Sequence, residues 1–229
     1  MSLFKTDKNT GSSIPPIDAA APARTETATL ALGCFWGPDA LYGSTPGVVR
    51  TRVGYSGGKQ PNPTYYNIDD HTETVQIEFD PEVVSYERIL DIFWHNHNPR
   101  KPGWLRQYMS ILFFHDEKQE LIARDIFDRE ASRIQEPIYT ELKPLTKFYV
   151  AESYHQKYHL RQYPDLIQEY QMIYPVDSDI VSSTAAARVN GYVTGYGTKE
   201  NFQRDIVGLG LSQEGIKRLT EIFNSFQKR

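Results

Sequence analysis

The chain has 229 residues, with 25 Lys and Arg against 29 Asp and Glu, and its formal net charge is −4 at pH 7. This length suits one large domain, or one domain with an appendage. The small negative charge argues against nucleic acid as a partner. No apolar run approaches the ~18 residues that span a bilayer, and the opening residues lack a secretory signal. We therefore expect a soluble, cytoplasmic protein with no membrane partner.

Cys34 is the single cysteine among these residues. Because no second cysteine is present among the 229 residues, Cys34 cannot form a disulfide with another of them. Zinc sites that need two or more thiolates are excluded for the same reason. We expect no metal and no cofactor. Aromatic residues make up 13% of the chain, which is enough for an apolar core and equally for an aromatic pocket.

The first 25 residues are rich in Ser, Thr, Pro and Ala and have no regular period, so they predict a mobile tail. The short apolar run 27–32 predicts a buried strand. Pro38 suits the first turn of a helix, so residues 39–42 are predicted to be helical. Cys34 is therefore expected at a junction between a strand and a helix.

Alternation and helical spacing predict the next elements. Strands are expected at 48–55, 72–79 and 108–114, and a helix at 85–97 that ends before Pro99. The order βαββαβ predicts a ferredoxin-like core of the α+β class, in which two helices cover one face of an antiparallel sheet.

The remaining residues predict additional elements and a C-terminal extension. We expect helices at 116–134 and 153–162, a strand at 138–142, and a terminal helix at 212–228 whose apolar stripe docks on the domain. The predicted organisation is a tail at 1–25, a catalytic domain at 26–165 and an extension at 166–229.

The surroundings of Cys34 suggest a reactive thiol. A thiolate is the reactive form, and a helix N-terminus lowers the pKa of a thiol. An inert core cysteine is the alternative, but Gly33 and Gly37 leave bare backbone on both sides, which suits a nucleophile that a substrate must reach. Phe35 and Trp36 could line an apolar pocket or belong to the core.

The segment 33–37, Gly-Cys-Phe-Trp-Gly, resembles the active-site signature of the peptide methionine sulfoxide reductase A family. Further landmarks of that family follow in order, and the resemblance spans about residues 27–164. These further landmarks are the segments 52–58, 62–65, 71–73, 79–81, 97–99 and 154–158.

The resemblance implies that Cys34 attacks the sulfur of methionine S-sulfoxide, free or in an oxidised protein, and becomes a sulfenic acid. It implies Glu73 as the proton donor, although alone Glu73 could be a glutamate that faces water. The other implied residues are Tyr65 and Tyr108, which bind the sulfoxide oxygen, and Phe35, Trp36 and His155, which bind the substrate. We expect a monomer.

Three departures from the family pattern stand out. Gly103 occupies the place of an aspartate five positions before Tyr108, and Arg106 or a water is expected to substitute for it. The segment between Pro99 and Tyr108 is shorter than the usual loop of the family. The loop from Tyr65 to Glu73 is also short, which leaves Tyr66 as an alternative to Tyr65. The glycine-rich segment 190–197 has no resolving cysteine. An external thiol must then reduce the sulfenic acid, and thioredoxin or glutathione with glutaredoxin are the candidates.

Other functions fit the sequence less well. A zinc deaminase with His71 and Glu73 needs two further cysteines. A metalloprotease helix with His155 and His159 needs Glu where Gln156 stands. A hydrolase with Cys34 as nucleophile and His71 or His155 as base leaves the tyrosines without a role. A module that binds methionine sulfoxide without turning it over is the remaining alternative.

Overall fold

The structure is a computed structural model that describes residues 14–227. A six-stranded sheet has the order β5-β4-β1-β3-β2-β6, and every neighbouring pair is antiparallel except β4 and β5, which are parallel. The strands are β1 (Glu26–Leu32), β2 (Val48–Ser56), β3 (Thr72–Phe79), β4 (Ser110–Phe114), β5 (Glu141–Pro144) and β6 (Phe148–Val150). The protein is thus a mixed α/β protein, and each strand expected from the sequence is present, with β6 in addition.

Helices pack on the sheet through the main apolar core. Val75, Ile77 and Phe79 of β3 meet Ile89 and Phe93 of α3 in one buried cluster. The helices of this part are α1 (Pro16–Ala19), α2 (Trp36–Gly43), α3 (Tyr86–His95), α4 (Glu117–Ile134) and the short 3₁₀ turns η1 (Arg106–Tyr108) and η2 (Ser153–His155). The alternation in β3 therefore predicted its core face correctly.

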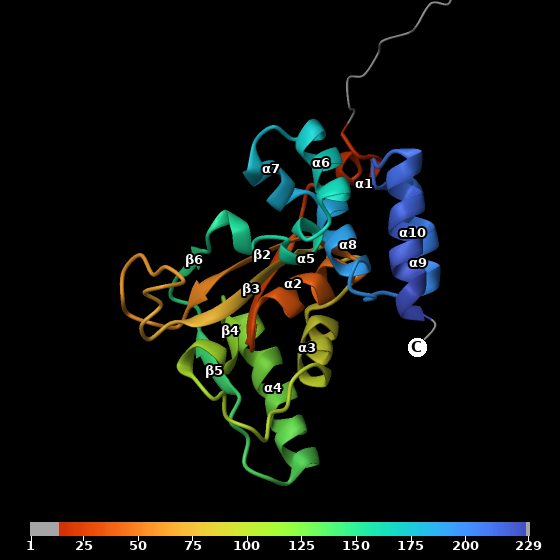
Figure 1. Ribbon diagram of the computed structural model, residues 1–229. Helices are drawn as coiled ribbons and strands as arrows, with labels where there is room; N and C mark the ends of the chain where they lie inside the picture. Colours follow the sequence, from red (N-terminus) through yellow and green to blue (C-terminus); the bar gives the residue numbers. More distant parts are fainter. Residues whose placement is uncertain (1–13, 228–229) are drawn as a thin grey trace, which may run out of the picture.

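A second apolar core lies in the C-terminal helices, which Figure 1 shows grouped on one side of the sheet. Helix α8 lies between α2 and α10. The helices are α5 (Tyr158–Arg161), α6 (Pro164–Ile173), α7 (Asp177–Ser182), α8 (Thr184–Tyr192), α9 (Lys199–Asp205), η3 (Ile206–Gly208) and α10 (Gln213–Gln227). Within residues 14–227, no helix combines the length and apolarity needed to cross a bilayer.

Helices α2 and α8 approach each other closely at two glycines. A Cβ on Gly191 would lie 2.5 Å from the carbonyl oxygen of Ala40, and one on Gly43 would collide with the carbonyl of Ala187. Arg188 also donates from α8 to the carbonyls of Gly43 and Val48. The C-terminal helices therefore hold the helix that follows Cys34.

The segment before β1 differs from the expected tail. Residues 1–13 lie outside the described part of the chain, but Pro16–Ala19 form α1. Asp18 accepts hydrogen bonds from the hydroxyls of Tyr174 and Ser183 and from the backbone amide of Ala185. The prediction of a tail as far as residue 25 is thus wrong for this part, because Asp18 binds polar groups distant in the sequence.

The helix predicted at 153–162 is divided into η2 and α5. Lys157 separates them and has a φ of 52°. This conformation costs a non-glycine residue about 1–3 kcal/mol. The backbone amide of Lys157 donates to Asp39, and its ammonium group donates to Asp39 and Thr51, which offsets that cost.

Candidate active site

Cys34 lies between the end of β1 and the start of α2, as its sequence surroundings predict. Gly33 has a φ of +89°, a conformation that favours glycine, and it turns the chain from the strand toward the helix. Phe35 is the N-cap residue of α2. The backbone amide of Trp36 lies near the Cys34 sulfur and favours its ionised form. The Cys34 side chain is exposed, so a substrate can reach it.

Glu73 of β3 is 1% exposed and lies against the loop that carries Cys34. One carboxylate oxygen accepts from the backbone amide of Phe35 at 2.9 Å, and the other accepts from the side chain of Gln107 at 2.6 Å. The Cys34 thiol lies next to the same carboxyl group. Burial raises the pKa of Glu73, and its interactions with the Phe35 amide, Gln107 and the Cys34 thiol oppose the shift.

The pKa of Cys34 does not fall, although the cysteine precedes a helix. The protein atoms around the sulfur raise the pKa of the thiol. The amide of Trp36 lowers it, but the charge and hydrogen bond of Glu73 raise it further. The expectation of a lowered pKa was therefore wrong, because desolvation and a neighbouring carboxylate outweigh the helix N-terminus.

Tyr65 and Tyr108 lie close to each other and near the thiol, so that Glu73, Tyr65 and Cys34 all influence the Tyr108 hydroxyl. Burial and the nearby Glu73 raise the pKa of Tyr108 to about 12, so its hydroxyl keeps its proton at neutral pH. Tyr66 is 91% exposed, whereas Tyr65 is partly buried against Phe35, Val53 and Tyr55. The structure therefore places Tyr65, and not Tyr66, at the site.

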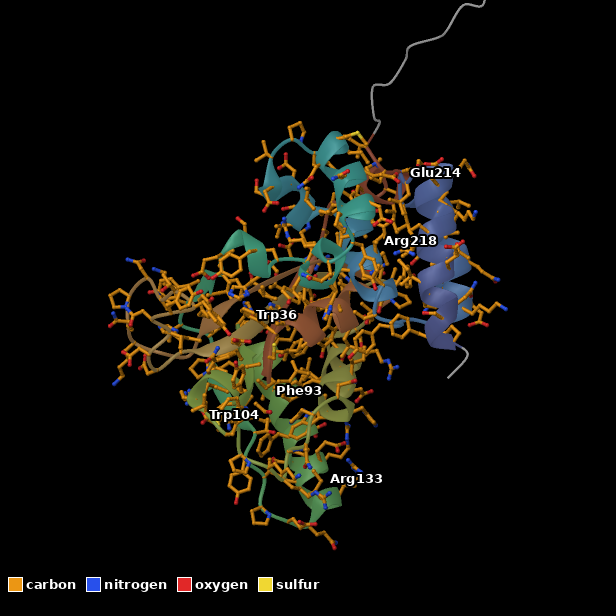
Figure 2. The ribbon with its side chains drawn as sticks, viewed as in Figure 1. Trp36, Phe93, Trp104, Arg133, Glu214 and Arg218 are labelled. Carbon is orange, nitrogen blue, oxygen red and sulfur yellow. The ribbon has the colours of Figure 1, made fainter. Side chains whose placement is uncertain are left out.

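Phe35, Trp36 and His155 form an aromatic group next to Cys34. The His155 ring lies 5.1 Å from Phe35 and 4.6 Å from Tyr65, measured between centroids. Figure 2 labels Trp36. Its indole nitrogen donates a hydrogen bond to Nδ1 of His155 at 3.1 Å. Burial lowers the pKa of His155, so the ring is neutral and can accept this bond.

Trp36 is held from its other side by Tyr158. Their rings stack with centroids 3.6 Å apart and an interplanar angle of 2°. Tyr158 begins α5, directly after the left-handed Lys157. The fixed indole gives the site a rigid apolar wall.

Gln107 is a site residue that the sequence did not identify. Arg106 was expected to replace the missing aspartate, but its guanidinium binds Glu141 at 2.9 Å and the carbonyl of Asp70. Gln107 reaches Glu73 instead. A Cβ on Gly103 would lie 2.7 Å from the Tyr108 carbonyl oxygen, so an aspartate does not fit there. The only sequence signal for Gln107 was its position next to Tyr108.

Glu152 is a second residue that sequence reasoning missed. It accepts from the hydroxyl of Tyr55 at 2.8 Å and from the backbone amide of Tyr65 at 3.0 Å. It thereby connects the Tyr65 loop to β2. Its carboxylate is distant from Cys34 in the sequence and belongs to no landmark, so only the fold could reveal it.

The histidines considered as catalytic bases have other partners. Nδ1 of His71 accepts from the amide of Gly58, and Nε2 hydrogen-bonds the carbonyl of Gln60. His155 hydrogen-bonds Trp36, and the carboxyl group of Glu73 lies next to the thiol. Within the described range 14–227, no three His, Cys, Asp or Glu side chains gather as metal ligands do. The geometry does not provide a cysteine–histidine pair.

The fold and the site define a thiol enzyme of mixed α/β architecture, in which a buried carboxyl group serves an exposed cysteine. A family model described as peptide methionine sulfoxide reductase matches residues 26–186, and a model described as the helical domain of selenoprotein methionine sulfoxide reductase A matches residues 176–224. The chain belongs to the peptide methionine sulfoxide reductase family.

Similar proteins agree with this assignment. A peptide methionine sulfoxide reductase of Drosophila melanogaster is 41% identical over 192 residues, which are 81% of this chain and 75% of that protein. A peptide methionine sulfoxide reductase MsrA of Methanosarcina acetivorans is 42% identical over 145 residues, which are 58% of this chain and 77% of that protein.

Solved structures are similar over the same region. Methionine sulfoxide reductase A of Corynebacterium diphtheriae is 33% identical, with a TM-score of 0.58 over 62% of this chain and 77% of that one. Reduced Mxr1 from Saccharomyces cerevisiae is 29% identical, with a TM-score of 0.56 over 62% of this chain and 88% of that one.

Proposed function

We propose that the protein reduces methionine S-sulfoxide, free or in proteins, to methionine at Cys34. The sulfur of Cys34 attacks the sulfoxide sulfur, and the sulfoxide oxygen is protonated and passes to Cys34. The products are methionine and a Cys34 sulfenic acid, so the cysteine is oxidised by two electrons while the sulfoxide is reduced by two.

One observation carries this proposal: the exposed Cys34 thiol lies beside the buried Glu73 carboxyl group, close enough for each group to shift the pKa of the other. A proton on Glu73 gives a thiolate nucleophile and a proton donor together. Burial raises the pKa of Glu73, which favours the protonated carboxyl. Because the two groups interact, their titrations are coupled.

The surrounding residues have supporting roles in the proposed reaction. The hydroxyls of Tyr65 and Tyr108 donate to the sulfoxide oxygen as charge develops on it. The rings of Phe35 and Trp36 pack on the methyl group of the substrate. Neutral His155 fixes the orientation of Trp36 through their hydrogen bond.

Regeneration requires a thiol from another molecule, because Cys34 is the single cysteine among the 229 residues. The external thiol attacks the sulfenic sulfur, water leaves, and a mixed disulfide forms that a second thiol resolves. Thioredoxin, or glutathione with glutaredoxin, are the proposed reductants. The exposure of Cys34 supports direct attack.

A single-turnover experiment tests the proposal. Mixed with free methionine S-sulfoxide and no reductant, the protein is expected to release up to one methionine per molecule and to lose its titratable thiol. Dithiothreitol is then expected to permit many turnovers, and Cys34→Ser to abolish both phases. Sulfoxide binding without methionine release would instead indicate a binding module.

The role of Glu73 has its own test. We expect Glu73→Gln to slow methionine release by ~10²-fold or more, the scale of losing a positioned proton donor. Glu78→Gln on the same strand is the control, since Glu78 pairs with Arg52 at 3.1 Å and has no contact with Cys34 among those described. A Glu73→Gln rate within twofold of the parent would remove Glu73 from the mechanism.

We also propose that strands β1 to β4 with α2 and α3 form a ferredoxin-like core. The support is the strand order β4-β1-β3-β2, with one helix between β1 and β2 and another between β3 and β4. Residues 26–165 would then form the catalytic domain, and 166–229 an extension whose apolar core also includes Leu160.

A further inference from the structure

Three exposed aromatic side chains surround the candidate active site. Tyr66 is 91% exposed, Trp104 77% and Tyr154 50%. They come from three separate segments: the loop after β2, the loop before β4 and the turn η2. Trp104 is labelled in Figure 2. We refer to these three side chains as the aromatic rim.

Each member of the aromatic rim packs on a ring of the site itself. Trp104 stacks on Tyr108 with centroids 5.2 Å apart and an interplanar angle of 22°. Tyr66 meets Tyr65 edge to face at 5.7 Å, and Tyr154 lies 4.2 Å from His155. The rim is therefore continuous with the rings of Tyr65, Tyr108 and His155 at the candidate active site.

The fold does not account for this arrangement. Single exposed aromatic residues are common, but apolar side chains that gather from separate segments mark binding surfaces. None of the three belongs to the described apolar cores. The carboxylates of Glu73 and Glu152 at the site are occupied by hydrogen bonds within the protein.

We propose that the aromatic rim binds the residues on either side of an oxidised methionine in a peptide chain and favours apolar or aromatic neighbours. Trp104 is the specificity-determining residue, since it has the largest exposed ring. Successive residues of an extended chain are ~3.3–3.6 Å apart, so the neighbours of a bound methionine fall within reach of the rim. The inference rests on the proposed function and names its substrate class.

The test compares two pentapeptides with a central methionine S-sulfoxide, one with Phe on both sides of it and one with Ser. Single-turnover rates give a selectivity ratio, Phe-flanked over Ser-flanked. The parent protein is expected to favour the Phe-flanked peptide. Trp104→Ala is expected to reduce the ratio about 2- to 10-fold, the scale of one lost aromatic pair, and Trp104→Phe to retain most of it.

Tyr196→Ala is the matched control, because Tyr196 is an exposed aromatic residue in the loop between α8 and α9, and its ratio is expected to equal that of the parent. An equal loss on both peptides in Trp104→Ala would overturn the inference, since Trp104 would then only support Tyr108. A parent that shows no preference would also overturn it. Failure of the parent to release methionine from any sulfoxide would count against the proposed function instead.

A protein reductant could also dock on these rings. Single turnover excludes this contribution, because no reductant is present. If Trp104→Ala changed only multiple turnover supported by thioredoxin and left the peptide ratio unaltered, the rim would be a reductant surface and the inference would be wrong.

Discussion

The ammonium nitrogen of Lys157 lies 3.0 Å from a carboxylate oxygen of Asp39, and both side chains are fully buried. Asp39 belongs to α2, five residues after Cys34 in the chain. Its other oxygen accepts from the amide of Lys157 and from the side chain of Asn190 in α8. This pair thus connects the cysteine-bearing helix to the Lys157 turn and to the C-terminal helices.

Lys157→Met is expected to destabilise the protein, because it leaves the buried charge of Asp39 without its partner. The expected loss in the free energy of unfolding is about 3–5 kcal/mol. Urea denaturation measures it. Arg218→Met is the control, because Arg218 pairs with Asp165 at the surface at 3.0 Å. It should cost no more than about 1 kcal/mol. A similar, small loss in both variants would contradict a structural role for the buried pair.

Titration of Cys34 is expected to depend on Glu73. In the parent, the midpoint for alkylation by iodoacetamide should lie above the ordinary thiol value of 9.0, because burial raises the pKa. Glu73→Gln should lower the midpoint, since the carboxylate charge stabilises the protonated thiol. Alkylation rates measured against pH test this. An unchanged midpoint would show that the two groups are not coupled.

Gln107→Met is expected to shift the pH dependence of single turnover. The hydrogen bond from Gln107 stabilises the ionised carboxylate and lowers the pKa of Glu73, so its removal should raise that pKa. If protonated Glu73 is the donor, the fall in rate with rising pH should move to higher pH. Gln60→Met, in the exposed loop after β2, is the control and should leave the profile unchanged. A rate that drops equally at every pH would argue that Gln107 only supports packing.

Two glycine substitutions are expected to have opposite effects on stability. Gly191→Ala places a methyl group 2.5 Å from the carbonyl oxygen of Ala40, so α8 must move away from α2. This should reduce the free energy of unfolding by about 1–3 kcal/mol. Gly37→Ala, within α2, meets no atom within 4 Å. It should stabilise the helix by about 0.5–1 kcal/mol. Thermal unfolding of both variants gives the comparison. Equal stability of the two would show that α2 and α8 are not held at this separation.

Local sequence patterns predicted many of the elements. The alternation in 72–79 predicted β3 and its core face, and Ser85 and Asp116 cap α3 and α4 with their side chains. These predictions succeeded because neighbours within a few residues determine strand faces and helix ends. The division of 153–162 was not predictable, because the conformation of Lys157 depends on Asp39, 118 residues away in the sequence.

The sequence by itself determined that the chain carries one cysteine, that this cysteine ends a strand and precedes a helix, and that a motif for sulfoxide reduction surrounds it. Only the tertiary structure decided the direction of the thiol pKa, because desolvation and the approach of Glu73 depend on how β3 packs beside the loop at 34. It also decided that Gln107 rather than Arg106 binds Glu73, since Glu141 and Asp70 bind the arginine. Contacts between distant segments fix such features, and no local pattern records them.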